Sequence, residues 1–535
     1  MPIRMTDDPQ DQQDNSSNSE NSGGGGGGGF NPSGGGGGGL FQLLPLLLSL
    51  FRGKRSILLI VLIVGGYFLM NRGQGCNIGD AIQQLSTGGF LDPRQFERAP
   101  IYEPTTEDPN KNALPESADL SKFAPTPKNQ GSQGSCVAWS SAYAARTILE
   151  AEKTGQNPDQ LTFSPAFLYN QIGLEDCQGS YIVRAMEYLN KQGAVPFDAF
   201  PYTDQDCTRQ PDGQLLKEAG QFRIQGFNRL SDGDRNNKLD FYAIKEHLAQ
   251  GSPVVIGMMV GQSFMQPMQG AEVWEPTSED AAGMSAGGHA MCVVGYDDKK
   301  FGGAFKIMNS WGTDWGQNGF GWVRYSDFNR YVREAYALEA PKPMSANLPF
   351  SAEVGLMEVV NQGTKTVAKD YIQLENSGEN VFTTSNALTS DTRFKIEIRN
   401  QQSCYIYIFG KETDGTSYTL FPYPNPEDAT TTKYSPFCGI TGYRLFPKDK
   451  SLQPDNIGKE DEMAIVVSKE PIDWYEINKK LSKNPGTSFA QRLKGLFPEA
   501  YGGDVRYSES GKGGIKFEGS ANSSLVVALI KVQKN

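Results

Sequence analysis

An uncharged apolar run, Ile57–Met70 (ILLIVLIVGGYFLM), limits the folds open to this chain more than any other feature. At about 1.5 Å per residue it spans roughly 21 Å as a helix, which is short of a hydrocarbon core of about 30 Å. The flanking Arg55 and Arg72 can snorkel and lengthen the span. A buried core helix is the alternative, but nothing else in the N-terminal region would cover it. We therefore expect a single transmembrane helix over about residues 56–71, within an anchor region of residues 40–71.

The charges beside this run predict its orientation. Arg52, Lys54 and Arg55 precede it and Arg72 follows it, so the positive-inside rule places the N-terminus in the cytoplasm. A cleaved signal peptide is disfavoured because about 55 residues precede the run. We expect a single-pass membrane protein in which everything after the run is extracytoplasmic, either periplasmic or extracellular.

Composition divides the rest of the 535 residues. Residues 1–39 are polar and then glycine-rich, and such a stretch buries too little apolar surface to become ordered, so we expect a disordered tail. Residues 72–113 are rich in Pro, Asp, Glu and Asn and are expected to form a linker. Dense globular patterns follow over residues 114–341 and 342–535.

Charge and histidine content exclude several functions. Fifty Lys and Arg against 61 Asp and Glu give a net charge of −11, so we expect no nucleic-acid partner. The only histidines are His247 and His289, and neither a paired-histidine zinc motif nor a P-loop is present. We expect chemistry that requires no metal and no organic cofactor.

The first motif with chemical meaning is Asn129-Gln-Gly-Ser-Gln-Gly-Ser-Cys136. Alanine content, apolar spacing and a terminal Gly155 predict a helix over about 136–153. Cys136 then sits at a helix N-terminus, where the backbone dipole favours a thiolate. Gln130 on the same loop can supply an amide N–H near the reacting centre. The alternative is a structural cysteine that caps the helix.

The second motif surrounds His289. Gly287–Tyr296 and Ala304–Met308 read as two strands joined by a turn-rich connector. A hairpin centred near Lys300 places His289 opposite about residue 311, with Asn309 on the same face. Asn309 can then bond the imidazole and fix its tautomer.

His247 provides a contrast. It lies in a helical pattern with charged neighbours, Phe241–Gln250, so we expect a solvated helix residue. His289, beside glycines that permit close approach, is the better catalytic candidate.

Together these residues resemble the papain-like cysteine peptidases, over residues 114 to about 340. Gln130 with Cys136, Gly288-His289-Ala290, and Asn309-Ser-Trp-Gly312 occur in that family's order. The resemblance implies that Cys136 is the nucleophile, His289 the general base and acid, and Asn309 its orienting partner. It also implies that Gln130 lies in the oxyanion hole and that Trp311 shields the His–Asn hydrogen bond.

Other parts of the chain bear on this resemblance. Val137 stands where the family usually has Trp, and Gly288 where Asp or Asn is common, so subsite preference does not carry over. Gln178-Gly179-Ser180 resembles the family's glycine-rich substrate stretch, whose backbone would pair with an extended substrate; an ordinary turn is the alternative. The family pattern also makes a Cys177–Cys207 disulfide plausible. Cys292 is expected to be a buried free thiol, and pairing of Cys404 with Cys438 is possible.

The C-terminal region reads as β-rich. Arg393–Arg399 and Cys404–Phe409 alternate in hydropathy, Met463–Ser468 and Leu525–Ile530 read as buried strands, and Tyr475–Leu481 reads as a helix. The region resembles a bacterial module of unknown function. Its aromatic residues favour sandwich packing over a binding face; these are Tyr405, Tyr407, Phe421 and Tyr423.

The predicted fold is therefore α+β, with a two-lobed papain-like catalytic domain of one helical and one β-barrel-like lobe. A transmembrane helix precedes it and a sandwich-like domain follows. The predicted function is a membrane-anchored cysteine endopeptidase acting on protein or peptide substrates, in an unknown oligomeric state. The alternatives are an inactive peptide-binding scaffold, or an exopeptidase or transpeptidase on the same triad. No long inhibitory propeptide is recognisable, which leaves open whether residues 77–113 lie across the active site.

Overall fold

The computed structural model describes residues 3–8, 87–231, 238–281, 287–339, 349–363, 365–503, 505–520 and 522–535. Most of the expected tail, the anchor region 40–71 with its predicted transmembrane helix, Cys76 and the junction near residue 341 lie outside these ranges. Within the described ranges, no helix is long and apolar enough to cross a membrane.

One continuous helical stretch organises the first lobe. It begins at Cys136 as α5 (Cys136–Ala138), continues as the π-helical η3 (Trp139–Arg146) and ends as α6 (Thr147–Thr154). Gly155 ends it in a left-handed conformation with φ of +68°, as a glycine after a helix commonly does. The predicted helix is confirmed. The lobe also holds α7 (Pro165–Ile172), α8 (Ile182–Lys191) and α9 (Gly213–Ala219).

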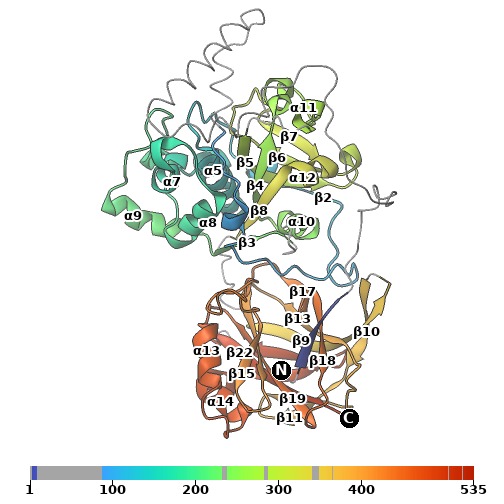
Figure 1. The fold of residues 1–535 in the computed structure, drawn as a ribbon. Helices are drawn as coiled ribbons and strands as arrows, with labels where there is room; N and C mark the ends of the chain where they lie inside the picture. Colours follow the sequence, from blue (N-terminus) through green and yellow to red (C-terminus); the bar gives the residue numbers. More distant parts are fainter. Residues whose placement is uncertain are drawn as a thin grey trace, which may run out of the picture. The chain divides into compact units, whose positions relative to one another are not determined.

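The second lobe is an antiparallel sheet with strand order β3-β8-β4-β5-β6-β7, and β2 pairs with β5. Its central strands are almost fully buried, because helices and the first lobe cover them. Figure 1 shows α5 beside β5. The strands are β2 (Ser117–Asp119), β3 (Gly226–Arg229), β4 (Val254–Val260), β5 (Gly287–Asp297), β6 (Ala304–Met308), β7 (Phe320–Arg324) and β8 (Val332–Glu339); the helices are α10 (Phe241–Ala249), α11 (Ser278–Ala281) and α12 (Tyr325–Tyr331).

The β5–β6 hairpin has the predicted register. Cys292 pairs with Met308, and a bulge lies between Val293 and Gly295. Continued beyond the last ladder pair, this register places His289 opposite Trp311. The histidine and Asn309 therefore meet at the open end of one hairpin, so local strand pairing alone brings them together.

The C-terminal region forms two packed sheets, and the predicted sandwich-like architecture is confirmed. One sheet has the order β1-β18-β13-β9-β21-β20 and the other β11-β12-β22-β19-β14-β15. Alternate residues of both sheets, such as Ile396 and Ile406, fill the core between them. The strands are β9 (Ser351–Gln362), β10 (Lys365–Ile372), β11 (Leu374–Gly378), β12 (Val381–Thr384), β13 (Phe394–Asn400), β14 (Cys404–Lys411), β15 (Ser417–Phe421), β16 (Phe437–Cys438), β17 (Gly442–Phe446), β18 (Lys450–Pro454), β19 (Glu460–Ser468), β20 (Val505–Ser510), β21 (Gly514–Gly519) and β22 (Leu525–Gln533).

Two helices cover the outer face of the second sheet, α13 (Trp474–Leu481) and α14 (Phe489–Leu496) (Figure 1). The first was predicted and the second was not. Tyr407 and Phe421 are buried, and Tyr405 and Tyr423 are partly buried, so these aromatic residues pack within the domain as expected.

Residues 3–7 differ from the expected disordered tail. They form β1 (Ile3–Asp7), which pairs antiparallel with β18 in the C-terminal domain. Ile3 is fully buried, and the Asp8 carboxylate accepts from Arg393 (2.8 Å) and pairs with Lys395 (2.7 Å). A short alternating segment with an acidic end thus forms the edge strand of this sheet, and its partner strand β18 lies more than 400 residues later in the sequence. The compositional argument, made for the whole tail, missed it.

The described part of the expected linker is not a loose spacer. Residues 87–91 lie against the catalytic domain, and α4 (Pro93–Phe96) buries Phe96 in its core. Tyr102 and Thr105 are also buried. Polar composition predicted solvation here, but both folded domains cover this segment.

Candidate active site

Cys136 lies at the start of α5 with its side chain fully buried. Its Sγ accepts a hydrogen bond from the backbone N–H of Ala290, at 3.4 Å. Ala290 directly follows His289 on β5, so the thiol of the first lobe meets the histidine strand of the second.

His289 and Asn309 form a direct hydrogen bond. Nε2 of His289 donates to Oδ1 of Asn309 over 2.7 Å, and both side chains are buried. Because Oδ1 can only accept, this contact places the imidazole proton on Nε2 and leaves Nδ1 available as a base. The backbone N–H of Ser310 also donates to Oδ1 (2.8 Å), which fixes the carboxamide.

Trp311 covers this pair. Its ring stacks on His289 with centroids 4.4 Å apart and an interplanar angle of 23°. The backbone of Trp311 bridges to Asn129, on the loop before Cys136. The indole thus shields the imidazole from water, and the backbone of Trp311 links the two lobes.

Gln130 is buried and its amide is held at both ends. Nε2 donates to the backbone carbonyl of Gln133 (2.9 Å), and Oε1 accepts from the hydroxyl of Ser310 (2.8 Å). The amide nitrogen carries two hydrogens. Its orientation is therefore fixed by residues on either side of the site.

The groove between Gly179–Ser180 and Gly287–His289 holds a segment of the same chain, residues 87–91, which we call the groove segment. Ser180 donates to Gly88 O (2.9 Å), and Phe90 donates back to Ser180 O (3.0 Å). On the opposite wall, Gly89 donates to Gly288 O (3.0 Å). The stretch expected to pair with an extended substrate therefore pairs with the protein's own backbone.

Leu91 fills a pocket at the end of the groove segment. Its side chain lies where β-carbons on Gly257 or Gly288 would clash, so these glycines make room for it. Glu334 lies in the same pocket with a carboxyl oxygen that has no hydrogen-bond partner in the described structure. Burial raises the pKa of Glu334 to about 8, although Tyr336 and the Asp92 backbone oppose this.

Burial also sets the charge of the central pair. It raises the pKa of Cys136 to about 12, against backbone hydrogen bonds that lower it. It lowers the pKa of His289 to about 4, against Asn309 and the Thr87 backbone, which raise it. A neutral thiol and a neutral imidazole are therefore stable here, whereas the helix N-terminus led us to expect a thiolate. The difference arises because both groups are buried, and loss of hydration disfavours their charged forms.

Comparison with known proteins agrees with this geometry. Residues 114–338 match the family described as papain family cysteine protease. Cathepsin K of Mus musculus is 29% identical over 249 residues, covering 45% of this chain and 68% of that protein. An uncharacterized peptidase C1-like protein of Acanthamoeba polyphaga mimivirus is 30% identical over 218 residues, covering 38% of this chain and 67% of that protein. The chain belongs to the papain family of cysteine proteases.

Solved structures of this family resemble the same region. Xylellain, a cysteine protease from Xylella fastidiosa, matches with 26% identity over 48% of this chain and 97% of that one, with a TM-score of 0.39. The family match and the curated relatives show that the protein is a cysteine peptidase with a papain-like α+β catalytic domain, and a β-rich region follows it.

The disulfide implied by the family resemblance and the expected free thiol at Cys292 are both confirmed, whereas the possible pairing of Cys404 with Cys438 is not formed. Cys177 and Cys207 form a disulfide, and Cys292 is a buried free thiol. Cys404 and Cys438 face each other across β14 and β16 and are both free thiols.

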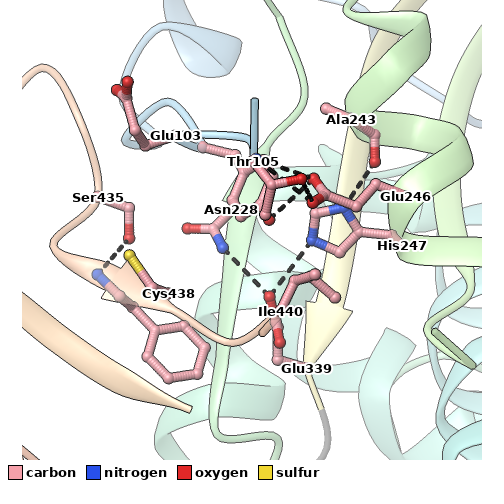
Figure 2. Close-up of polar contacts among 12 residues, drawn as sticks. Glu103, Thr105, Asn228, Ala243, Glu246, His247, Glu339, Ser435, Cys438 and Ile440 are labelled. Atoms are coloured by element: carbon pink, nitrogen blue, oxygen red, sulfur yellow. Dashed lines mark hydrogen bonds and ion pairs between the residues drawn. The ribbon is translucent and has the colours of Figure 1, made fainter. Parts of the chain in front are cut away.

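His247 was expected to be solvated, and that prediction is wrong. The ring is fully buried, its Nδ1 lies 2.7 Å from Ala243 O, and its Nε2 lies 3.3 Å from Glu339 Oε1 (Figure 2). The cause is the expected linker, since Tyr102 packs on the ring with centroids 4.4 Å apart. The contrast with His289 still holds, because the contacts of His247 do not include Cys136.

The structure pairs His289 with Asn309, the Ala290 backbone with Cys136, and Ser310 with Gln130. The sequence analysis did not identify the groove segment. The signal was present as Thr87-Gly-Gly-Phe-Leu91, two glycines and two large apolar residues within a polar stretch. Such a pattern is typical of a backbone that must approach another closely.

Proposed function

We propose that the chain is an endopeptidase that hydrolyses peptide bonds in proteins or peptides through Cys136. The observation that carries this is the hydrogen bond from His289 Nε2 to Asn309 Oδ1, next to a sulfur that is 3.4 Å from the Ala290 amide. It leaves an unprotonated imidazole nitrogen on the residue beside the thiol. An acyl-transfer site needs that arrangement of nucleophile, base and orienting group.

The chemistry follows from these positions once the groove admits substrate. His289 takes the proton of Cys136, and the thiolate at the helix N-terminus attacks the peptide carbonyl. The amide of Gln130 and the backbone N–H of Cys136 stabilise the oxyanion. The imidazolium then protonates the leaving amine, and His289 activates a water that hydrolyses the thioester. No metal or organic cofactor enters these steps.

The test is peptide hydrolysis by the full chain and by Cys136→Ala and His289→Ala. Both variants should lose turnover by about 10³-fold or more while unfolding at the parent's temperature. A Cys136→Ala variant that hydrolyses peptides as fast as the parent would exclude the assignment. Intact parent protein that binds peptides without cleaving them would favour the scaffold alternative, and product analysis separates endopeptidase from exopeptidase or transpeptidase.

We also propose that the described conformation is a closed state. The groove segment occupies the backbone positions that an extended substrate needs, and it accompanies a neutral thiol and imidazole. Peptide hydrolysis therefore requires that residues 87–91 leave the groove, by displacement or by cleavage of the segment.

Attachment to a membrane through residues 40–71 is a further part of this proposal, supported by the uncharged run Ile57–Met70. The pairing of β1 with β18 disagrees with the expected single-pass topology. One crossing between residues 8 and 87 would separate β1 from its partner strand. We therefore place the N-terminus and the catalytic domain on the same side of the membrane.

A further inference from the structure

We propose that the C-terminal domain acts as the holder of the groove segment, because it binds the next part of the same chain, residues 100–112, which we call the strap. This inference rests on the proposed function, since it concerns access to Cys136. Three features of the structure support it. The connection between the two segments is short, the strap lies between two domains, and the buried guanidinium of Arg444 donates hydrogen bonds to the strap.

The connection between groove segment and strap is short and itself fixed. Asp92 caps α4, and its carboxylate accepts from the Arg94 backbone (3.0 Å). Phe96 is buried in the catalytic core, and its carbonyl accepts from Arg229 (3.3 Å). Little slack therefore separates Leu91 from the strap, so a strap that stays bound limits how far the groove segment can withdraw.

The strap begins as a strand shared by both domains. Ile101 donates to Lys433 O (2.9 Å) and its carbonyl accepts from Ser435 (2.8 Å), both of the C-terminal domain. On the catalytic side, Arg229 donates to Pro100 O (3.1 Å) and Tyr102 donates to Arg229 O (2.9 Å). Ile101 is fully buried between them. Without the C-terminal domain, one edge of this strand would lose all its partners.

Arg444 makes the strap part of a buried charge site. This fully buried guanidinium donates to Glu103 O (2.9 Å) and Tyr102 Oη (3.0 Å) of the strap. Within its own domain it donates to Asn400 Oδ1 (2.6 Å) and Ile440 O (2.7 Å). Departure of the strap would leave half of these donors unpaired, and a buried cation that loses its partners is strongly disfavoured.

The catalytic side binds the strap through Glu246. Its carboxylate accepts from the backbone and hydroxyl of Thr105 (Figure 2). It also accepts from Tyr102 Oη (3.1 Å). Glu246 and His247 are neighbours on α10, so the strap also covers the histidine that the sequence led us to expect in solvent.

The far end of the strap is fixed through Asn112. Its Nδ2 donates to Thr106 O (2.8 Å) and Tyr443 O (3.1 Å), and its Oδ1 accepts from the Tyr443 backbone (3.0 Å). Lys111 pairs with Glu397 beside it. The C-terminal domain thus binds both ends of the strap.

The experiment measures alkylation of Cys136 by iodoacetamide, located by mass spectrometry, and amide hydrogen exchange in the full chain. Asn112→Ala and Arg444→Met should each speed alkylation and exchange of residues 87–91 by about fivefold or more, the usual scale of coupling between sites. Asn376→Ala is the matched control, because the exposed side chain of Asn376, on β11 of the same domain, has Gly378 N (2.8 Å) as its only hydrogen-bond partner among the described residues. It should leave both rates unchanged.

Unchanged alkylation in both strap variants would overturn the inference. If Arg444→Met fails to fold, Asn112→Ala decides alone. Leu91→Asp separates the two levels of argument, because it weakens the groove segment directly. If Leu91→Asp is alkylated quickly and hydrolyses peptides while the strap variants are silent, only this inference fails. If Leu91→Asp is alkylated quickly but hydrolyses nothing, the proposed function fails.

Discussion

Gly88, which has a φ of +77°, lies against the backbone of Gly134. Gly134 is two residues before the candidate nucleophile, Cys136. A β-carbon on Gly88 would overlap the carbonyl of Gly134. The positive φ of Gly88 is also unfavourable for a residue that carries a β-carbon. The groove segment therefore fits beside Cys136 only as bare backbone.

Gly88→Val should release the groove segment and raise both peptide hydrolysis and alkylation of Cys136. Overpacking and left-handed strain together cost about 2–3 kcal/mol, which corresponds to a shift of roughly 30- to 150-fold toward the open state. Gly155→Ala is the control, since Gly155 is also left-handed but has open space around it. Equal alkylation rates in Gly88→Val and the parent would contradict the closed state.

The closed state should also open as pH falls. The pKa of His289 is about 4 when buried, and a hydrated imidazole titrates near 6.5. The open state therefore binds more protons between these values, so acidification favours opening. From pH 7.5 to pH 5 the titration of His289 alone should raise the open population about 25-fold. Exchange of the Gly89 and Phe90 amides, corrected for its intrinsic pH dependence, measures this.

His289→Gln removes the titrating group and should abolish that pH dependence. Cys136 titrates in the opposite range, because burial raises its pKa to about 12. These two groups by themselves make the closed state most stable between roughly pH 6.5 and 9, whereas Glu334, whose pKa is raised to about 8 by burial, destabilises it as the pH rises toward that value. If the exchange of residues 87–91 keeps its pH dependence in His289→Gln, another group causes it.

Gln130→Ala, measured in the Gly88→Val background so that the groove is open, should lower kcat by about 10²–10³-fold with little change in KM. The loss would come from one missing donor to the oxyanion. Gln133→Ala is matched to it, because the side-chain oxygen of Gln133 has no hydrogen-bond partner within the described ranges and its backbone carbonyl would still accept from Gln130. Similar losses of kcat in both variants would argue against an oxyanion role.

Local signals predicted the residues of the site. A helix start fixes Cys136, and hairpin parity fixes His289 relative to Asn309. Both depend on contacts between residues close in sequence, which periodicity and turn chemistry encode. The meeting of the two lobes was not derivable in this way and came from the family resemblance.

Long-range contacts account for what the sequence did not reveal. The burial of His247 depends on Tyr102, and the order of β1 depends on β18. The groove segment is ordered by Ser180 and Gly288, which lie 90 and 200 residues further along the chain. Composition indicates only how polar a segment is on average. A polar stretch is therefore predicted to be a solvated linker even where two folded domains cover it.

His247→Ala should lower the free energy of unfolding by about 3 kcal/mol. It leaves the buried Glu339 carboxylate without its imidazole partner and creates a cavity beside Tyr102. Chemical denaturation measures this change. Peptide hydrolysis per folded molecule should stay at the parent rate, whereas loss of hydrolysis with unchanged stability would place His247 in the mechanism.

The pairing of β1 with β18 predicts a specific cross-link in the membrane-bound full chain. Arg4 and Gln453 are directly opposite, and paired strand residues have Cα separations that a disulfide can span. Arg4→Cys with Gln453→Cys should cross-link when oxidised with glutathione disulfide. Asp7→Cys with Gln453→Cys should not, because these positions are three residues out of register, about 10 Å apart. Formation of the first bond requires both flanks of residues 40–71 on one side of the bilayer. The opposite result would be that neither pair cross-links and that a membrane-impermeant thiol reagent reaches the two cysteines of each pair from opposite sides of the bilayer. In that case β1 does not pair with β18, and the single-pass orientation expected from the sequence holds.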